Sequence, residues 1–167
     1  METRTYTREQ ILTGNLDQVF AFFADATHLE FITPPWLRFQ TISALPAQME
    51  QGVTMEHKLK LHRIPVRWVT EISEWSPPYK FVDRQKVGPF STWIHSHEFV
   101  PVPTGTLMTD TVVYRVPGWL LGRLIDWLYV SRDIRRIFEY RQQAIAKLLE
   151  RNQETLEQFS NLDGLSQ

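Results

Sequence analysis

The sequence predicts an α+β protein in which a curved antiparallel sheet wraps around a long C-terminal helix. Three observations indicate this class. Six segments with alternating polar and apolar residues follow one another between residues 36 and 115. Two short helical segments precede them, and an apolar stripe at helical spacing follows them. Alternation is typical of strands, whereas apolar recurrence at every third or fourth residue is typical of helices.

The first elements are a short strand at residues 6–12 and a pair of short helices. Asn15 is a suitable N-cap for the first helix, because its side chain can accept hydrogen bonds from the unpaired N–H groups of the first turn. Asp25 with Thr27 can start the second helix in the same way, and Pro34-Pro35 must end it.

The alternating segments form the main sheet. We expect strands at residues 36–42, 53–61, 65–75, 80–85, 92–100 and 107–115. Because the loops between them have about two to six residues, neighbouring strands run antiparallel as a meander.

A long helix follows Pro117-Gly118, with a break expected at residues 130–133. Its apolar stripe packs against the sheet. We expect one domain at residues 1–150, since the composition supports a single core, and a polar tail at 151–167 that frays into a mobile terminus.

Composition excludes several classes of function. Lysine plus arginine number 18 and aspartate plus glutamate 19, so we expect no nucleic-acid partner. The chain has no cysteine, which excludes disulfides and thiolate chemistry. No signal peptide or apolar span of membrane length is present, so we expect a cytoplasmic protein without stable membrane insertion. The oligomeric state is open.

The hairpin turns predict which residues face one another across the sheet. The turn at residues 102–105 pairs His97 with Asp110 and His95 with Val112. The remaining pairs expected are Phe99 with Met108, Trp93 with Tyr114, His57 with Trp68, Leu59 with Val66, Ile72 with Phe81, Thr70 with Asp83 and Trp68 with Gln85.

In these registers the inner face of the sheet holds many polar groups. Burying a polar group without partners costs about 1 to 3 kcal/mol, so either these groups satisfy one another or they line a space that holds water or a ligand. Apolar walls with a few polar groups are typical of a small-molecule pocket. The predicted ligand-binding residues are His57, Trp68, Phe81, Asp83, Gln85, Trp93, His95, His97, Phe99, Met108, Asp110 and Tyr114.

Three stretches carry a resemblance to a known family: EISEWSPPYKFVDRQKVGPF at 71–90, WIHSHEFVPVPTGTLMTDTVVYRVP at 93–117 and IFEYRQQAIAKLL at 137–149. Together with the order of elements, they resemble the START/Bet v 1-like (SRPBCC) superfamily, and most of all its polyketide cyclase/dehydrase and lipid-transport branch. The resemblance covers about residues 3–150. It implies a helix-grip fold around a deep cavity for hydrophobic ligands, and it transfers no catalytic residue.

The leading hypothesis is therefore binding or transport of a small hydrophobic molecule such as a lipid, quinone or polyketide. A rival is a cyclase or dehydratase that uses His95 or His97 as acid or base, with Asp110 as the orienting carboxylate. We expect no cofactor. We also expect no metal, because histidines two apart on a strand need further ligands to share an ion.

Two further alternatives concern the helical segment. The domain could be a protein-interaction module with a closed cavity. The apolar stretch at residues 119–130 either packs against the first helices or forms a lid that contacts membrane transiently. Arg132, Arg135 and Arg136 suit a solvated helix face, whereas helical geometry leaves Arg141 open between that face and the end of the pocket.

Overall fold

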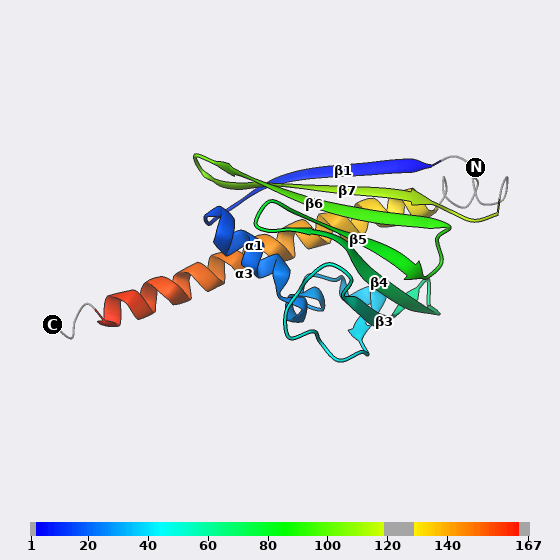
Figure 1. Cartoon of the computed structure of the whole chain (residues 1–167), viewed down its shortest axis with the longest axis horizontal. Helices are drawn as coiled ribbons and strands as arrows, with labels where there is room; N and C mark the ends of the chain where they lie inside the picture. Colours follow the sequence, from blue (N-terminus) through cyan, green and yellow to red (C-terminus); the bar gives the residue numbers. More distant parts are fainter. Residues whose placement is uncertain (1–2, 119–128, 164–167) are drawn as a thin grey trace.

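A seven-stranded antiparallel sheet curves around one long helix in the computed structural model of the chain (Figure 1). The structure describes residues 3–118 and 129–163. Its elements are β1 (Arg4–Leu12), α1 (Leu16–Ala24), η1 (Ala26–Leu29), η2 (Pro35–Leu37), β2 (Gln40–Thr41), β3 (Thr54–Leu61), β4 (Ile64–Ser76), β5 (Lys80–Val87), β6 (Thr92–Val102), β7 (Gly105–Arg115) and α3 (Ser131–Asp163).

Strands β2 to β7 form the predicted meander, and β1 joins it at the far edge beside β7. The spatial order is β1-β7-β6-β5-β4-β3-β2. Helices α1 and α3 both lie on the concave side of the sheet (Figure 1). This arrangement confirms the α+β prediction and the wrapping of the sheet around the C-terminal helix.

The short helices after β1 begin where the caps predict. Asn15 accepts a hydrogen bond from the Gln18 backbone N–H at 3.0 Å, and the Gln18 side chain accepts one from the Asn15 N–H. These paired bonds satisfy N–H groups that have no partner within the helix. Asp25 caps the second segment through Thr27, and that segment is a short 3-10 helix, η1.

The expected strand at residues 36–42 is wrong over most of its length. Pro35–Leu37 form the 3-10 turn η2, which Pro34 precedes, and Arg38 ends it in a left-handed conformation with φ of 46°. Only Gln40–Thr41 pair with β3. The two prolines fix φ and supply no N–H donor, so a turn forms where side-chain alternation suggested a strand.

Two of the three predicted hairpin registers are confirmed. His97 faces Asp110 across β6 and β7, and His57 faces Trp68 across β3 and β4. The third register, between β4 and β5, is wrong. Ile72 faces Asp83 instead of Phe81, Thr70 faces Gln85 instead of Asp83, and Trp75 faces Phe81.

The error between β4 and β5 has a physical cause. Strand β4 continues to Ser76, so the turn lies later than expected. The ladder is then irregular between Ile72 and Glu74 and again between Val69 and Thr70. A β-bulge adds one residue to one strand, and this returns Trp75 to the inner face, where it packs on Phe81 with ring centroids 5.6 Å apart.

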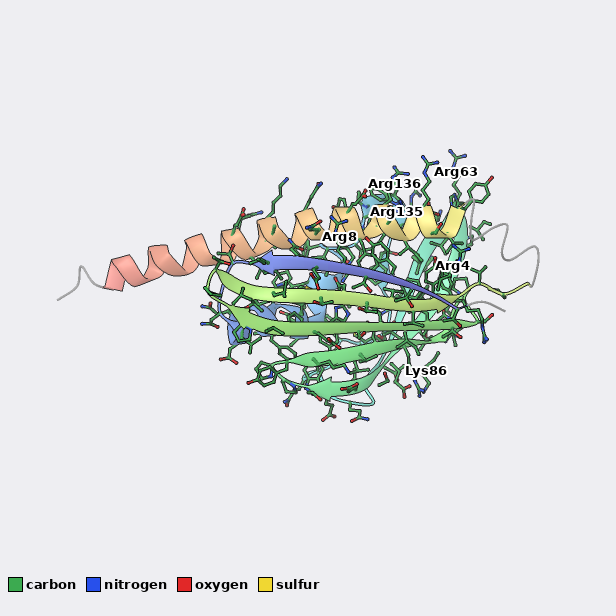
Figure 2. The ribbon with its side chains drawn as sticks, turned by 90° about the horizontal axis from the view of Figure 1, so that it is seen from above. Arg4, Arg8, Arg63, Lys86, Arg135 and Arg136 are labelled. Atoms are coloured by element: carbon green, nitrogen blue, oxygen red, sulfur yellow. The ribbon has the colours of Figure 1, made fainter. Side chains whose placement is uncertain are left out.

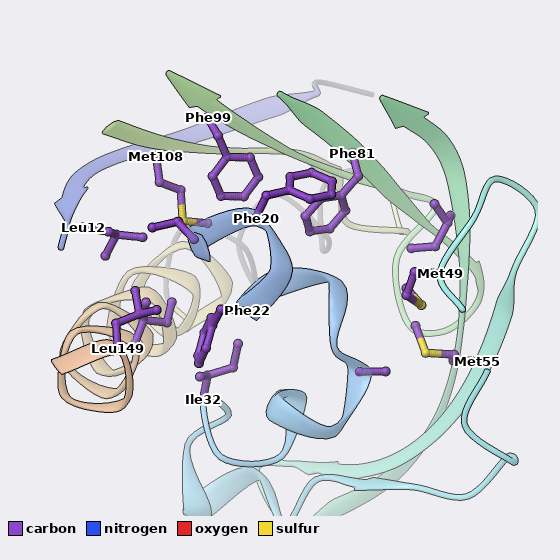
Figure 3. Packing of buried hydrophobic residues seen from close by; sticks show 14 residues of the cluster. Leu12, Phe20, Phe22, Ile32, Met49, Met55, Phe81, Phe99, Met108 and Leu149 are labelled. Carbon is purple, nitrogen blue, oxygen red and sulfur yellow. The ribbon is translucent and has the colours of Figure 1, made fainter. Parts of the chain in front are cut away.

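One part of the space between sheet and helices is filled by side chains, and we call it the solid end. Its fully or nearly buried members are Leu12, Val19, Phe20, Phe99, Met108, Ile145 and Leu149. Figure 3 shows Phe20 of α1 reaching under the sheet toward Phe99 and Phe81. Its ring lies 5.5 Å from that of Phe99 in an edge-on contact, which is a favourable geometry for aromatic pairs.

Helix α3 begins at Ser131, within the predicted break, and continues through Asp163. Its last turns extend past the sheet (Figure 1). The apolar segment that either packs against the first helices or forms a lid lies mainly in residues 119–128, outside the described residues. Within the described part of the chain, no helix has both the length and the hydrophobicity that a membrane span requires.

Candidate ligand chamber

Beside the solid end the same concave face encloses a chamber of about 570 Å³. Three layers line it: the inner face of strands β3 to β6, the segment from α1 to η2, and the first turns of α3. Most of the lining is apolar. The contributing aromatic residues are Phe22, Phe23, Phe39, Trp68, Phe81, Phe90, Trp93, Tyr129 and Phe138.

Two tryptophans from different strands form one aromatic wall. The rings of Trp68 and Trp93 are perpendicular, with centroids 5.2 Å apart, and Phe90 packs on Trp93 at 4.8 Å. The indole N–H of Trp68 donates to the Thr70 hydroxyl at 3.1 Å. The wall therefore presents rings to the chamber while its indole donor is satisfied.

Beside this wall lie four polar side chains that we call the histidine–aspartate cluster: His95, His97, Asp83 and Asp110. The first three line the chamber. His95 Nε2 contacts Asp110 Oδ1 at 2.9 Å, and His97 Nε2 contacts Asp83 Oδ2 at 3.2 Å. The other ring nitrogens complete the cluster, because His97 Nδ1 lies 2.8 Å from Asp110 Oδ1 and His95 Nδ1 lies 3.5 Å from Asp83 Oδ2.

These distances assign different protonation to the two histidines. His97 Nδ1 lies 2.8 Å from Asp110 Oδ1 without the directionality of a hydrogen bond. A bare nitrogen lone pair so close to a carboxylate oxygen would be repelled, so we assign a proton to both nitrogens of His97. His95 Nδ1, at 3.5 Å from Asp83, needs no proton.

The directions of the pKa shifts agree with that assignment. Burial disfavours a charged His97, but the Asp110 and Asp83 carboxylates outweigh it and raise the pKa of His97. Burial and the neighbouring charge of His97 lower the pKa of His95. Burial opposes ionisation of Asp110, yet His97 and His95 together hold the pKa of Asp110 far below its ordinary value.

Another charged group, Arg141, reaches the chamber from α3. The inward-facing stripe of this helix is Ile134, Phe138, Ile145 and Leu149, all buried, and Arg141 occupies the stripe's middle position by helical spacing. Its guanidinium lies 5.7 Å from the centre of the Phe138 ring. Burial lowers the pKa of Arg141, against the raising effect of Asp110 and Asp83.

His57 lies apart from the cluster on β3. Its Nδ1 is 3.2 Å from the Thr41 hydroxyl, and its ring stacks on Phe39 with centroids 4.8 Å apart. Burial lowers the pKa of His57, although Asp83, Glu30 and Glu56 act in the opposite direction. His57 is therefore a neutral, hydrogen-bonded member of the wall at neutral pH.

The structure brings seven of the twelve predicted ligand-binding residues to the chamber. They are His57, Trp68, Phe81, Asp83, Trp93, His95 and His97. The other five lie elsewhere. Phe99 and Met108 belong to the solid end, Asp110 lies behind the histidines, Tyr114 packs with Val112 and Phe138, and Gln85 bonds the backbone of Phe90.

Residues from the helices complete the lining, and our sequence reasoning on the sheet did not select them. Phe22 and Phe23 come from α1, and Ile137, Phe138 and Arg141 come from α3. For Arg141 a signal existed in the sequence. It is a charged residue within an otherwise apolar helical stripe, a position at which a solvated arginine is unexpected.

Three of the cluster residues have the chemistry of metal ligands. One ligand atom each from Asp83, His95 and His97 lie within 4.8 Å of one another. Each histidine nitrogen, however, already faces a carboxylate oxygen. His97 pairs with both carboxylates and Arg141 attracts them at longer range, so the charge balance of the cluster does not require a cation.

Comparisons with known proteins agree with this architecture. The model of the family described as polyketide cyclase/dehydrase and lipid transport matches residues 14–138. No curated protein matches the chain significantly.

Several solved structures share the fold. Protein TTHA0849 from Thermus thermophilus has a TM-score of 0.65 at 17% identity, over 89% of this chain and 99% of that one. Protein NE0264 from Nitrosomonas europaea has a TM-score of 0.67 at 11% identity, over 90% and 96%. Ara h 8.0201 has a TM-score of 0.63 at 11% identity, over 89% and 98%. At these identities the likeness establishes the helix-grip fold alone.

Proposed function

The chain belongs to the polyketide cyclase/dehydrase and lipid transport family, and we propose that it binds or carries a small, mainly hydrophobic molecule in the chamber. The observation that carries the proposal is the chamber itself. A space of about 570 Å³ walled mainly by aromatic and aliphatic side chains, with a smaller number of polar groups that include the histidine–aspartate cluster, suits a ligand with an apolar body and a polar group.

The hydrogen bonding of the histidines favours binding over catalysis. A general acid or base needs a ring nitrogen within reach of the substrate. Both nitrogens of His97 face carboxylates, and its ring stacks on Phe81 with centroids 4.1 Å apart. His95 bonds Asp110 through Nε2 at 2.9 Å, and its Nδ1 lies 3.5 Å from Asp83. The polar cluster therefore acts as a fixed electrostatic wall.

Native mass spectrometry of freshly purified protein tests this proposal. We expect a co-purifying molecule that denaturation releases and that organic extraction identifies as lipid, quinone or polyketide-like. An apo mass across several preparations, together with no binding of added fatty acid, alcohol or quinone, would contradict it.

The cyclase or dehydratase alternative retains one supporting observation, the presence of His95 and His97 on the chamber wall beside carboxylates. It predicts turnover of a polyketide-like substrate that disappears in His97→Gln while the fold persists. A protein-interaction module would need a closed cavity, and the volume of the chamber argues against it.

A further inference from the structure

Arg141 stands in an unusual position for an arginine. It lines the chamber, and its Nε is buried without a hydrogen-bond partner. Among the described residues its guanidinium makes no hydrogen bond or close ion pair, and its one defined contact is the 5.7 Å approach to the Phe138 ring. The carboxylates of Asp83 and Asp110 influence it only through longer-range attraction.

Arg141 is half-buried as a whole, and its Nε is fully buried without a partner, which is costly. Removing an ion from water without a paired charge and hydrogen bonds costs several kcal/mol. Burial lowers the pKa of Arg141, but arginine stays protonated in proteins. The side chain therefore offers N–H donors to the chamber that no described protein group accepts.

We propose that Arg141 is the anchor for a carboxylate, and that the ligand of the chamber is a hydrophobic carboxylic acid with its acid group on Arg141 and its apolar body against the aromatic walls. This inference rests on the proposed function and specifies its ligand class. A planar carboxylate matches the fork of a guanidinium with two parallel hydrogen bonds.

The two charges that act on Arg141, those of Asp83 and Asp110, favour a monoanion at this point. Asp83 Oδ2 lies 3.2 Å from Nε2 of the charged His97, which compensates the charge of Asp83. Asp110 lies behind the histidines, outside the lining. A ligand amine would meet the charge of Arg141 directly, and a phosphate dianion would bring a second negative charge toward Asp83.

Three lipids with the same chain length test the inference: dodecanoate, dodecanol and dodecylamine. Each is titrated below its solubility limit or micelle concentration, at a pH where the acid is ionised. The wild-type protein is expected to bind dodecanoate at least about tenfold more tightly than dodecanol, because hydrogen bonds to charged groups are the stronger class. Transfer from water to an apolar site is more favourable for the neutral alcohol than for the ionised acid. A tighter binding of the acid would therefore have to come from its carboxylate. Dodecylamine is expected to bind most weakly.

Two variants locate the anchor. Arg141→Leu keeps an apolar stem in the inward stripe, and we expect dodecanoate affinity to fall about 10- to 100-fold while dodecanol binding is retained. Arg135→Leu is the matched control on the same helix (Figure 2), because Arg135 is exposed and does not line the chamber. This control should leave both affinities unchanged.

The outcomes separate the inference from the proposed function. Equal affinity of the wild-type protein for acid and alcohol, or an unchanged acid preference in Arg141→Leu, overturns the carboxylate anchor while binding in the chamber stands. Failure of all three lipids to bind wild-type protein contradicts the anchor and the proposed function together. The wild-type comparison is decisive even if Arg141→Leu does not fold.

Discussion

The solid end and the histidine–aspartate cluster at the chamber wall take neighbouring residues from the same two strands. On β6 and β7, Phe99 faces Met108 within the solid end, and two residues away His97 faces Asp110 in the histidine–aspartate cluster. All four side chains are almost fully buried. One pair excludes water by packing, whereas the other pair is stabilised by charge.

The difference shows how one sheet face supports both stability and a ligand site. Apolar residues at the solid end gain free energy when they leave water. The cluster gains none from burial, and its members are stable there because each charge has a partner. Because the charges of the cluster are paired with one another, this wall can be polar and still well ordered. A chamber can therefore persist beside it.

The largest loss of stability is expected from a substitution in the solid end. Phe99→Ala removes a ring that contacts Phe20, Phe23 and Phe81. We expect the free energy of unfolding to fall by about 4 kcal/mol, measured by urea denaturation. The preference for acid over alcohol should persist in folded protein. Val100→Ala, at an exposed neighbour, is the control, and an equal loss there would contradict the packing argument.

Asp110→Asn tests the chamber wall. The substitution keeps the shape but leaves the charge of His97 with weaker compensation, so we expect a loss of about 3 kcal/mol at neutral pH. Because the pKa of His97 is raised in the folded state, its contribution is present below its unfolded pKa and is lost as pH rises through the folded pKa. The difference between wild type and variant should therefore narrow at alkaline pH. A difference that stays constant there would contradict the assignment of charge to His97.

His57→Gln should change the free energy of unfolding less than Asp110→Asn does, and its effect should appear at acidic instead of neutral pH. The pKa of His57 is lowered below 6.5 by burial, so the unfolded state binds a proton that the folded state does not. Wild type then loses stability as pH falls below 6.5 toward the folded pKa. Between neutral pH and about pH 5, the free energy of unfolding of the variant should rise relative to that of wild type by roughly 1 kcal/mol or less, since one pKa unit is worth about 1.4 kcal/mol. Urea denaturation at several pH values measures this difference. The same pH dependence of the free energy of unfolding in both proteins would contradict the prediction.

The smallest effect is expected on the outer face of the sheet. Arg67 donates to both carboxylate oxygens of Glu56, at 2.5 and 2.9 Å, in a pair that is open to solvent. Exposed ion pairs are screened by water and salt, so Arg67→Gln should not change the melting temperature measurably. A loss of stability as large as that of Asp110→Asn would contradict the claim that buried charges contribute more to stability than exposed ones.

The sequence predicts much of the sheet because tight turns and alternation fix local pairing. The turn after Val102 gives the facing of His97 and Asp110 from spacing alone. The register of β4 and β5 could not be predicted in the same way, because bulges near Thr70 and Glu74 insert residues without a local signal. The strand expected from Trp36 failed because two prolines outweighed side-chain alternation.

The site was predictable in position more than in composition. Excess polarity on the inner face led us to expect a chamber, but the cluster residues largely satisfy one another. Helices α1 and α3 supply walls whose approach to the sheet depends on tertiary packing. Arg141 is the residue whose role depends most on that packing, since its sequence position alone fits two different faces.

Methionine methyl NMR tests the central claim most directly, because the described methionines divide between the two regions. Met49 and Met55 line the chamber, whereas Met108 belongs to the solid end (Figure 3). Titration of methyl-labelled protein with dodecanoate should shift the Met49 and Met55 signals and leave Met108 in place. Saturable binding that leaves both chamber methyls unmoved, or that moves Met108 as far as they move, would contradict the account.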